Sequence, residues 1–370
     1  MRLMISGGGT GGHVYPALAV VHTLEHDPAY QGRLTDLVWV GSRGGLEEGL
    51  VEGAGIAYRG ISAAGLRGKD PLDLIRGLTK LGQGYLQSQK LLAEYRPDVL
   101  FVTGGYVCAP VTVAAHRQGI PVGIYLPDIE PGQAIKFLSR YANCVAVTAP
   151  PAQRFFPDGL TTVTGYPVRA ELYQTTPADA RTRLNLDPDE PVLLVFGGSQ
   201  GARSINQAIA NPDALVCLLA QTQIVHISGK LDADWTHSVQ ANLPVDLKAR
   251  YHLYPYLHAE MADALVSADL IISRAGASVL GEATAVGATS ILVPYPHSGA
   301  HQWANAQYLA DQRAAVIIAD KDLEAKLVTT ALDLLNDNKK RTQMGSTART
   351  LAQPDAAQKL VNMLIDLSRG

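Results

Sequence analysis

The chain has 370 residues, which is long for one hydrophobic core and favours two domains. Hydrophobic residues make up 47% and charged residues 18%, so the composition excludes an intrinsically disordered protein. A net charge of -3 argues against a nucleic-acid-binding protein, because such a protein would carry a broad basic excess. The 3 cysteines fit no metal-ligand pattern and indicate a reducing compartment.

The sequence contains no obvious targeting or membrane-spanning segment. The apolar run at Met1–Ser6 is too short for a signal peptide. No stretch approaches the roughly 18 apolar residues that a membrane span needs. We therefore expect a soluble cytoplasmic protein that is at most attached to a membrane surface.

Short apolar runs alternate with helical stretches and Gly or Pro turns, which is typical of α/β domains with parallel sheets. The expected strands are Arg2–Ser6, Leu37–Val40, Val99–Thr103, Val122–Tyr125, Cys144–Val147 and Thr161–Thr164, then Val192–Phe196, Gln223–Ser228, Leu270–Ser273 and Thr289–Val293. A glycine-proline hinge at Gly165–Arg169 separates the two series. The helical spacing of apolar residues in Ala356–Ser368 predicts packing against the first domain. We expect domains at 1–165 plus 351–370 and at 166–350.

A glycine-rich loop, Gly7–His13, follows the first expected strand and precedes a helix at Tyr15–Leu24. Glycines let backbone N–H groups approach an anionic or polar ligand closely. The loop contains G-x-G-x-x-G, but a dinucleotide site needs an acidic residue at the end of the second strand. Leu37–Val40 leads into no carboxylate, although Arg43 leaves NADP binding open as an alternative.

His13 stands at the mouth of this loop, on the first turn of the helix. An imidazole titrates near neutral pH, so it suits proton transfer at this position. The alternative is a side chain that only hydrogen-bonds loop carbonyls. We favour the functional role.

The second half carries two similar turns. Gly197–Arg203 follows an apolar strand, and its glycines and serine suit a diphosphate. Ser273–Ser278 precedes a helix that we expect to begin near Ser278 and to carry Glu282 on its first turns. A carboxylate there can accept two hydrogen bonds from a ribose diol. Alone, Glu282 is better explained as an acid that suits a helix dipole.

The last motif is Pro294–His297, followed by an amide-bearing helix. Gln302 and Asn305 are three residues apart, so they share a helix face. Amides recognise sugar hydroxyls because each offers both donors and an acceptor. His297 and His301 form a weak metal-pair candidate, since Pro296 and Gly299 indicate that this stretch is loop.

Taken together, these motifs resemble the MurG family, peripheral membrane N-acetylglucosaminyltransferases of peptidoglycan synthesis with a GT-B fold of two Rossmann-like domains facing a cleft. The matching residues are Gly8–His13 with Pro16–Ala19, Gly104–Tyr106, Gly198–Arg203 with Asn206, Ser273–Ser278 with Glu282, and Pro294–His297 with His301, Gln302 and Asn305. The resemblance spans nearly the whole chain. It implies inverting transfer of N-acetylglucosamine from UDP-N-acetylglucosamine to lipid I, the undecaprenyl-pyrophosphate-linked acceptor, which forms lipid II.

The resemblance also assigns roles to residues. In the donor domain, Ser199 and Arg169 would approach the diphosphate, Glu282 the ribose, Leu257 the uracil through its backbone, and Gln302 and Asn305 the sugar. In the first domain, Thr10, Gly11, Gly12 and Tyr106 would form the acceptor and diphosphate loop. Inverting transfer needs a base for the acceptor hydroxyl, for which His13 is the favoured candidate, or an organiser of the acceptor, and Asp128 is the other. No metal and no cofactor is implied. The expected location is the inner face of the cell membrane.

Two departures from the family lie on the acceptor side. Tyr125–Asp128 reads Tyr-Leu-Pro-Asp where the family has His-Glu-Gln-Asn, and Ile135 replaces an asparagine. The UDP-sugar donor is therefore better supported than the acceptor. A related glycosyltransferase with another lipid acceptor, a UDP-N-acetylglucosamine 2-epimerase and a non-catalytic binding subunit remain as alternatives.

The stretch from Arg59 to Arg96 is basic in an otherwise acidic protein. It holds 7 basic and 3 acidic residues, a net charge of +4, with leucines interleaved. Such a helix can lie on anionic lipid. Packing of an amphipathic helix on a sheet explains the pattern equally well.

Overall fold

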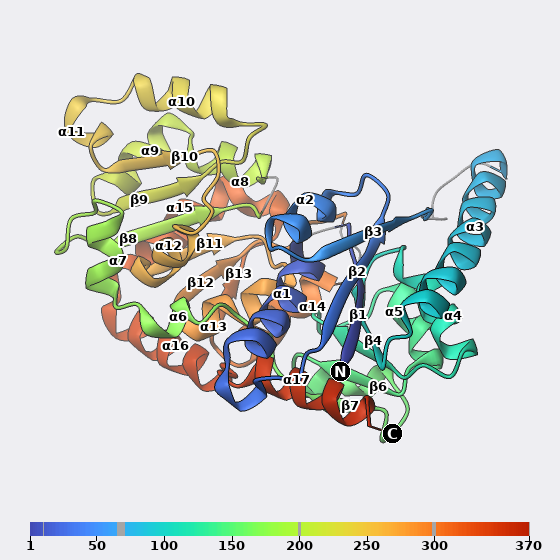
Figure 1. Cartoon of the computed structure of the whole chain (residues 1–370). Helices are drawn as coiled ribbons and strands as arrows, with labels where there is room; N and C mark the ends of the chain where they lie inside the picture. The colour runs from blue at the N-terminus through green and yellow to red at the C-terminus, as the bar shows by residue number, and fades with distance from the viewer. Residues whose placement is uncertain (10, 65–70, 199–200, 298–300, 370) are drawn as a thin grey trace. The chain divides into compact units, whose positions relative to one another are not determined.

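The computed structural model describes residues 1–9, 11–64, 71–198, 201–297 and 301–369 (Figure 1). Internal contacts divide the chain into two compact units. The first contains Met1–Pro167 and Asp355–Gly370, and the second contains Val168–Pro354. Each unit is built around one parallel sheet with helices on both faces.

The sheet of the first unit has seven strands in the order β3-β2-β1-β4-β5-β6-β7, all paired in parallel. They are β1 Arg2–Gly7, β2 Asp36–Ser42, β3 Ala57–Ile61, β4 Val99–Gly104, β5 Val122–Leu126, β6 Cys144–Val147 and β7 Thr161–Val163. The strand order reverses between β1 and β4. Ligands of such sheets bind beyond the carboxyl ends of the strands at this reversal. The pairing of β1 with β4 is irregular between Ser6 and Gly7, where the first glycine loop begins.

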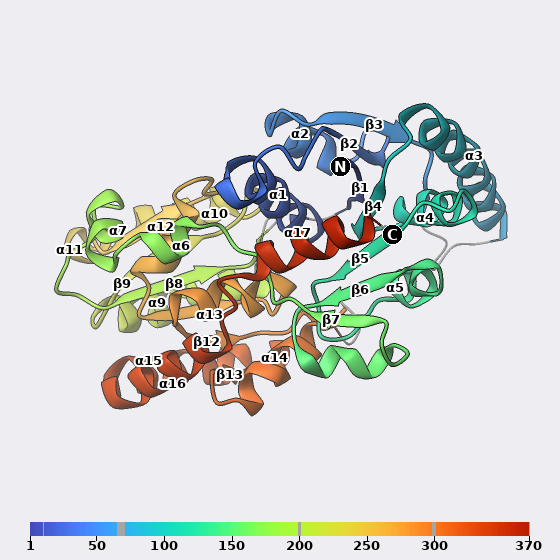
Figure 2. The same cartoon turned by 60° about the horizontal axis from the view of Figure 1, so that its bottom comes forward.

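Helices cover both faces of this sheet. They are α1 Gly11–His26, α2 Leu46–Gly53, α3 Pro71–Tyr95, α4 Cys108–Arg117, α5 Gln133–Leu138 and α17 Ala356–Leu367. Figure 2 shows α17 beside α1 and β5, and contacts join it to both. Gly123 on β5 makes this close approach possible, since a Cβ there would lie 3.0 Å from Met363.

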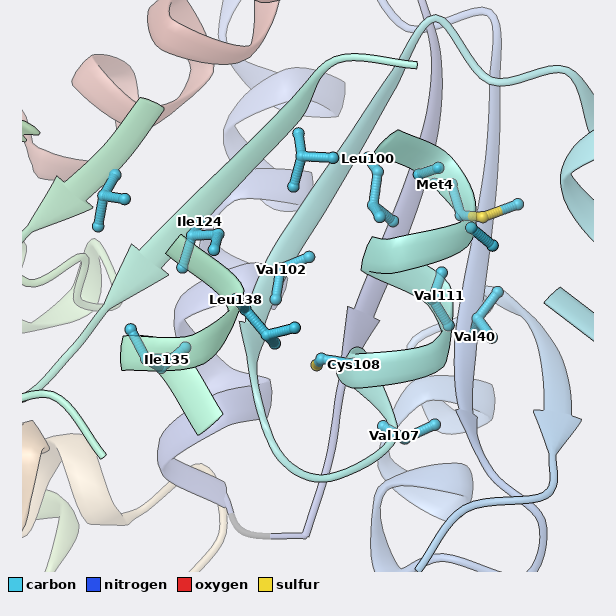
Figure 3. Packing of buried hydrophobic residues seen from close by; sticks show 14 of the residues in the cluster. Met4, Val40, Leu100, Val102, Val107, Cys108, Val111, Ile124, Ile135 and Leu138 are labelled. Carbon is cyan, nitrogen blue, oxygen red and sulfur yellow. The ribbon is translucent and has the colours of Figure 1, made fainter. Parts of the chain in front are cut away.

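The core between the sheet and α4 consists of aliphatic side chains from alternate strand positions (Figure 3). Met4, Val40, Val102 and Ile124 come from four neighbouring strands, and Leu138 closes the cluster from α5. Burial of these side chains fixes the carboxyl ends of the strands, from which the functional loops start.

The second unit has a six-stranded parallel sheet in the order β10-β9-β8-β11-β12-β13. The strands are β8 Val192–Phe196, β9 Gln223–Ile227, β10 Tyr251–Tyr254, β11 Leu270–Ser273, β12 Thr289–Leu292 and β13 Ala315–Ile317. The helices are α6 Glu171–Gln174, α7 Pro177–Arg183, α8 Arg203–Ile209, α9 Pro212–Leu219, α10 Ala233–Ala241, α11 Val245–Lys248, α12 Met261–Ser267, α13 Glu282–Val286, α14 His301–Asp311, α15 Leu323–Asn336 and α16 Asn338–Leu351. Here the order reverses between β8 and β11.

The predicted fold class of two parallel-sheet α/β units is confirmed. Three strands are absent from the sequence-based prediction: β3, β10 and β13. All three lie at a sheet edge and are only partly buried, so they lack the continuous apolar runs of the central strands. Within the described residues, no helix is both long and apolar enough to cross a membrane.

Candidate functional site

Gly8 lies where three elements of the first unit meet. Its backbone N–H donates to the carbonyl of Gly104 at the end of β4, at 3.0 Å. Its own carbonyl accepts a hydrogen bond from Nδ1 of His13 at 2.9 Å. A Cβ on Gly8 would overlap the carboxylate of Glu47. Glycine at this position therefore lets the backbone pass close to Glu47.

His13 lies on the first turn of α1 and packs against the end of β4. A Cβ on Gly104 would lie 2.8 Å from Cδ2 and Nε2 of the imidazole, and Gly104 has a φ of 122°. A carbonyl can only accept, so the bond to Gly8 places a proton on Nδ1. In the neutral ring, Nε2 then carries the lone pair and is the basic atom.

The described acceptor-side residues that were predicted with His13 lie at the start of α1 or just after β4. Gly11 and Gly12 form the start of α1 with His13, and Tyr106 follows β4 with 56% of its surface exposed. Thr10 lies outside the described residues. The predicted acceptor loop therefore gathers at the reversal between β1 and β4.

Glu47, on the first turn of α2, was not predicted as a site residue. Its carboxylate is buried and accepts hydrogen bonds from the backbone N–H groups of Gly9 at 3.1 Å and Ser42 at 2.8 Å. In the sequence it resembles an ordinary acid at a helix start, so no pattern distinguishes it.

The departures on the acceptor side lie in and after β5. Tyr125 is fully buried, and its hydroxyl lies 2.9 Å from Oγ1 of Thr148 and donates to the carbonyl of Gly165 at 3.2 Å. Burial is the main cause that raises the pKa of Tyr125, so its hydroxyl stays neutral. Asp128 lies just beyond β5 and is half-buried, and Ile135 is buried in the aliphatic core.

In the second unit, Glu282 and Arg169 lie close together although they are distant in sequence. Burial raises the pKa of the Glu282 carboxyl, while a hydrogen bond with Ser278 and the charge of Arg169 oppose that shift. Arg169 also donates from Nη1 to the carbonyl of His258 at 3.4 Å. Leu257, the preceding residue, is buried in the same unit. Three predicted donor residues therefore meet here.

Ser278 and Glu282 do not share one helix as predicted. A short 3-10 turn, Ala277–Leu280, precedes α13, which begins at Glu282.

The two amides of α14 hold neighbouring loops. Oε1 of Gln302 accepts from the backbone N–H of Tyr295 at 2.8 Å. Asn305 is fully buried, and its Nδ2 donates to the carbonyl of Ala275 at 3.1 Å. Both amides thus fix the turns that follow β11 and β12.

A buried chain of hydrogen bonds supports the second glycine loop, in which Ser199 and Gln200 lie outside the described residues. The hydroxyl of Tyr251 lies 2.6 Å from Nδ1 of His226, whose Nε2 lies 3.0 Å from Oδ1 of Asn206. Nδ2 of Asn206 donates to Oδ2 of Asp232 at 2.8 Å, and Arg203 binds the same carboxylate. Burial lowers the pKa of His226 to about 4, so the ring is neutral.

Asn206 links this chain to the loop. Its Nδ2 also donates to the carbonyl of Ser228 at 2.7 Å. Gly201 approaches the same carbonyl so closely that a Cβ would overlap it. The backbone after β8 is therefore held against the end of β9.

Arg274 connects the turn after β11 with its neighbours. Its guanidinium forms an ion pair with Asp320 and donates to Oγ of Ser204 at 2.8 Å and to the carbonyl of Val293 at 3.3 Å. It also lies over the ring of Tyr295, 5.2 Å from the centroid. Three loops at the carboxyl edge of the sheet are thereby joined.

Within the described ranges, no group of three or more His, Cys, Asp or Glu side chains converges to hold a metal ion. The ring of His297 packs edge-on against Tyr295, with centroids 5.5 Å apart.

Two Rossmann-like parallel sheets form the GT-B fold, and matches to family models identify the chain as a glycosyltransferase. The chain matches the Glycosyltransferase family 28 N-terminal domain over residues 3–147 and the Glycosyltransferase family 28 C-terminal domain over residues 192–360.

Relatives over the full length define the family more narrowly. A UDP-N-acetylglucosamine--N-acetylmuramyl-(pentapeptide) pyrophosphoryl-undecaprenol N-acetylglucosamine transferase of Roseiflexus sp. (strain RS-1) is 40% identical over 98% of this chain and 94% of its own. One of the same name from Halothermothrix orenii is 34% identical over 100% of both chains. The chain belongs to this family, the MurG family.

Solved structures show the same relationship. The crystal structure of Acinetobacter baumannii MurG is 30% identical, covers 99% of both chains and gives a TM-score of 0.76. The UDP-GlcNAc 2-epimerase of Neisseria meningitidis shares the fold at a TM-score of 0.68, with 13% identity over 99% of this chain and 100% of its own. The predicted GT-B fold and the predicted family are confirmed.

Proposed function

We propose that this chain transfers N-acetylglucosamine from UDP-N-acetylglucosamine to the muramoyl sugar of lipid I, with inversion at the sugar C1, and so forms lipid II. The observation that carries the proposal is the full-length match of both units to transferases with this printed name, at 34–40% identity. The residues gathered in each unit fit the two halves of the reaction.

We assign UDP to the second unit. Glu282 accepts hydrogen bonds from the ribose diol, since an ionised carboxylate offers only acceptor sites. Arg169, close to Glu282, and Ser199 stabilise the diphosphate as it leaves with negative charge. The backbone of Leu257, next to the His258 carbonyl that Arg169 holds, contacts uracil.

We assign the donor sugar to Gln302. Its Oε1 is engaged by the backbone of Tyr295, so its amide nitrogen is the atom that meets a sugar hydroxyl. Asn305 is fully buried and holds Ala275. Asn305 therefore acts on the sugar indirectly, by fixing the turn that leads to Ser278.

We assign acceptor activation to the first unit. Nε2 of His13 takes the proton of the acceptor hydroxyl as its oxygen bonds to C1 of N-acetylglucosamine. The bond from C1 to the UDP oxygen breaks on the opposite face, which inverts the configuration. The loop of Gly11, Gly12 and Thr10, together with Tyr106, contacts the acceptor and its diphosphate.

We further propose that the chain attaches to the inner face of the cell membrane through α3. Leu78 and Leu86 on this helix are 53% and 65% exposed. Arg76, Lys80 and Lys90 are also exposed on it. Exposed leucines among basic side chains suit an anionic lipid surface. The other side of α3 packs on α4 through Tyr85 and Leu92.

Product analysis tests the proposal. Purified protein with UDP-N-acetylglucosamine is expected to release UDP only when lipid I is present. UDP and UDP-N-acetylglucosamine are also expected to raise the melting temperature, whereas NADPH is not, because only ligands of the native state stabilise it. Conversion of UDP-N-acetylglucosamine to its 2-epimer without lipid would contradict the proposed transferase activity. Stabilisation by NADPH and not by UDP would contradict the assignment of a UDP-sugar as the donor.

A further inference from the structure

Glu47 is a carboxylate enclosed beneath the first glycine loop. Only 2% of its surface is exposed, and none of the ion pairs found among the described residues includes it. Its negative charge is balanced by N–H groups: Oε2 accepts from Gly9 at 3.1 Å and Oε1 from Ser42 at 2.8 Å. The hydroxyl of Tyr58, which donates to the carbonyl of Ser42 at 2.7 Å, also lies 3.4 Å from Oε1. Burial of a carboxylate costs free energy unless its hydrogen bonds are made, so Glu47 depends on these N–H donors.

The N–H that Glu47 binds and the carbonyl that His13 binds belong to one peptide group. The planar bond between Gly8 and Gly9 carries both the carbonyl of Gly8 and the N–H of Gly9. Glu47 therefore hydrogen-bonds to the N–H on one side of this peptide, and Nδ1 of His13 hydrogen-bonds to the carbonyl on the other side at 2.9 Å. Rotation of the peptide would break both hydrogen bonds at once.

The surrounding glycines make room for this arrangement. A Cβ on Gly8 would overlap the Glu47 carboxylate, and one on Gly45 would lie 2.5 Å from Oε1. A Cβ on Gly105 would lie 2.5 Å from the Gly8 carbonyl oxygen. The peptide plane is thus enclosed from α2 and from the end of β4.

We propose that Glu47 is a positioning residue for His13, which acts through the Gly8–Gly9 peptide. By fixing this plane, Glu47 aims the Gly8 carbonyl at Nδ1, holds the Nδ1–H tautomer and makes Nε2 the basic atom. Polarisation of the peptide by the carboxylate also strengthens the carbonyl as an acceptor. The catalytic consequence rests on the proposed function, in which His13 is the base; the control of the tautomer does not.

Glu47→Gln tests the inference at constant side-chain size. A glutamine has one acceptor and one donor end, so it cannot accept from both Gly9 and Ser42. We expect kcat for transfer to lipid I to fall about 10- to 100-fold, the scale of a misplaced catalytic group, with KM for UDP-N-acetylglucosamine unchanged. Glu48→Gln is the matched control: Glu48 accepts from the N–H of Gly44 at 3.0 Å on the outer side of the same helix start. We expect it to keep the parent kcat.

A double-mutant cycle with His13→Ala separates positioning from a general structural role. In the His13→Ala background, Glu47→Gln is expected to lower kcat by less than about twofold, because the residue through which it acts is gone. The same loss in both backgrounds, or an unchanged kcat in Glu47→Gln alone, overturns the inference. If Glu47→Gln is poorly folded, Glu47→Asp, which keeps the charge but shortens the reach, decides the question by the same cycle.

Nitrogen NMR of labelled histidine provides a readout that needs no transferase activity. The His13 signals, assigned by their loss in His13→Ala, are expected to show protonated Nδ1 in the parent and a tautomer mixture in Glu47→Gln. If the tautomer changes in Glu47→Gln but the parent protein transfers no sugar to lipid I, the proposed function is contradicted. The positioning role of Glu47 is then still supported. Normal transfer with an unchanged tautomer in Glu47→Gln would overturn the inference alone.

Discussion

Nδ1 of His13 lies 2.9 Å from the carbonyl oxygen of Gly8. A histidine so held has one orientation and one tautomer, with Nε2 as its basic atom. The ring also packs on Gly104 at the end of the neighbouring strand β4. The backbone of the first unit therefore holds an imidazole in one orientation at the reversal of strand order.

The first prediction concerns His13→Ala. We expect turnover with lipid I to fall by roughly 10²–10⁴, the usual contribution of acid–base catalysis, while UDP affinity stays near the parent value. Steady-state transfer and UDP calorimetry measure the two quantities. A parallel loss of UDP binding would indicate damage beyond the acceptor side.

Asp128 is the competing candidate for the base that the resemblance to the family raises in the sequence analysis. An asparagine can position a hydroxyl but cannot accept its proton. If His13 is the base, Asp128→Asn keeps transfer within about tenfold, or 1.4 kcal/mol. If turnover falls 10²-fold or more in Asp128→Asn while His13→Ala stays nearly active, Asp128 and not His13 is the base.

Glu282 is expected to carry ribose recognition. Glu282→Ala should weaken UDP binding by about 1.5–3 kcal/mol, the range for hydrogen bonds to charged groups. Glu324→Ala is the control, since Glu324 is an exposed carboxylate on the first turn of α15 in the same unit. Unchanged UDP affinity in a folded Glu282→Ala protein would show that Glu282 does not bind the ribose and only suits the start of the helix.

The buried His226 makes stability depend on pH. Its folded pKa is about 4 against an ordinary 6.5, so the unfolded chain binds a proton between these values and the folded chain does not. The stabilisation is complete above pH 6.5 and is lost as pH falls towards 4. The difference between these two pKa values corresponds to roughly 3–4 kcal/mol of stability, at about 1.4 kcal/mol per pKa unit.

Urea unfolding of the parent and of His226→Gln at several pH values measures this loss. We expect the variant to be less stable at pH 7 but to lose less stability towards pH 4. His237→Gln is the control, because His237 is exposed in the same unit and should follow the parent. Parallel curves for the parent and His226→Gln would show that His226 takes up a proton in the folded state.

The sequence predicts most of the fold because the central strands are continuous apolar runs between glycine turns. The loops that follow β1, β8 and β11 are predicted for the same reason, and His13 and Glu282 stand within or just after them. The half-exposed edge strands β3 and β10 lack this pattern and are missed.

Other features depend on distant contacts, which no local pattern encodes. Glu47 is distinguished from other helix-start acids only by burial beneath Gly8. Asn305 shares a helix face with Gln302, yet it is fully buried on Ala275. Side-chain type predicts that an amide can bind a hydroxyl, but packing decides which one is exposed to do so.

Isolation of the lipid product tests the central claim most directly. The purified parent protein is incubated with UDP-N-acetylglucosamine and lipid I, and the lipid is analysed by mass spectrometry and NMR. We predict a lipid heavier by one N-acetylhexosamine residue, with the new linkage at the muramoyl sugar and inverted relative to the donor, and with UDP released in equal amount. Recovery of unmodified lipid I under conditions in which UDP-N-acetylglucosamine binds, or a product with retained configuration, would contradict the account.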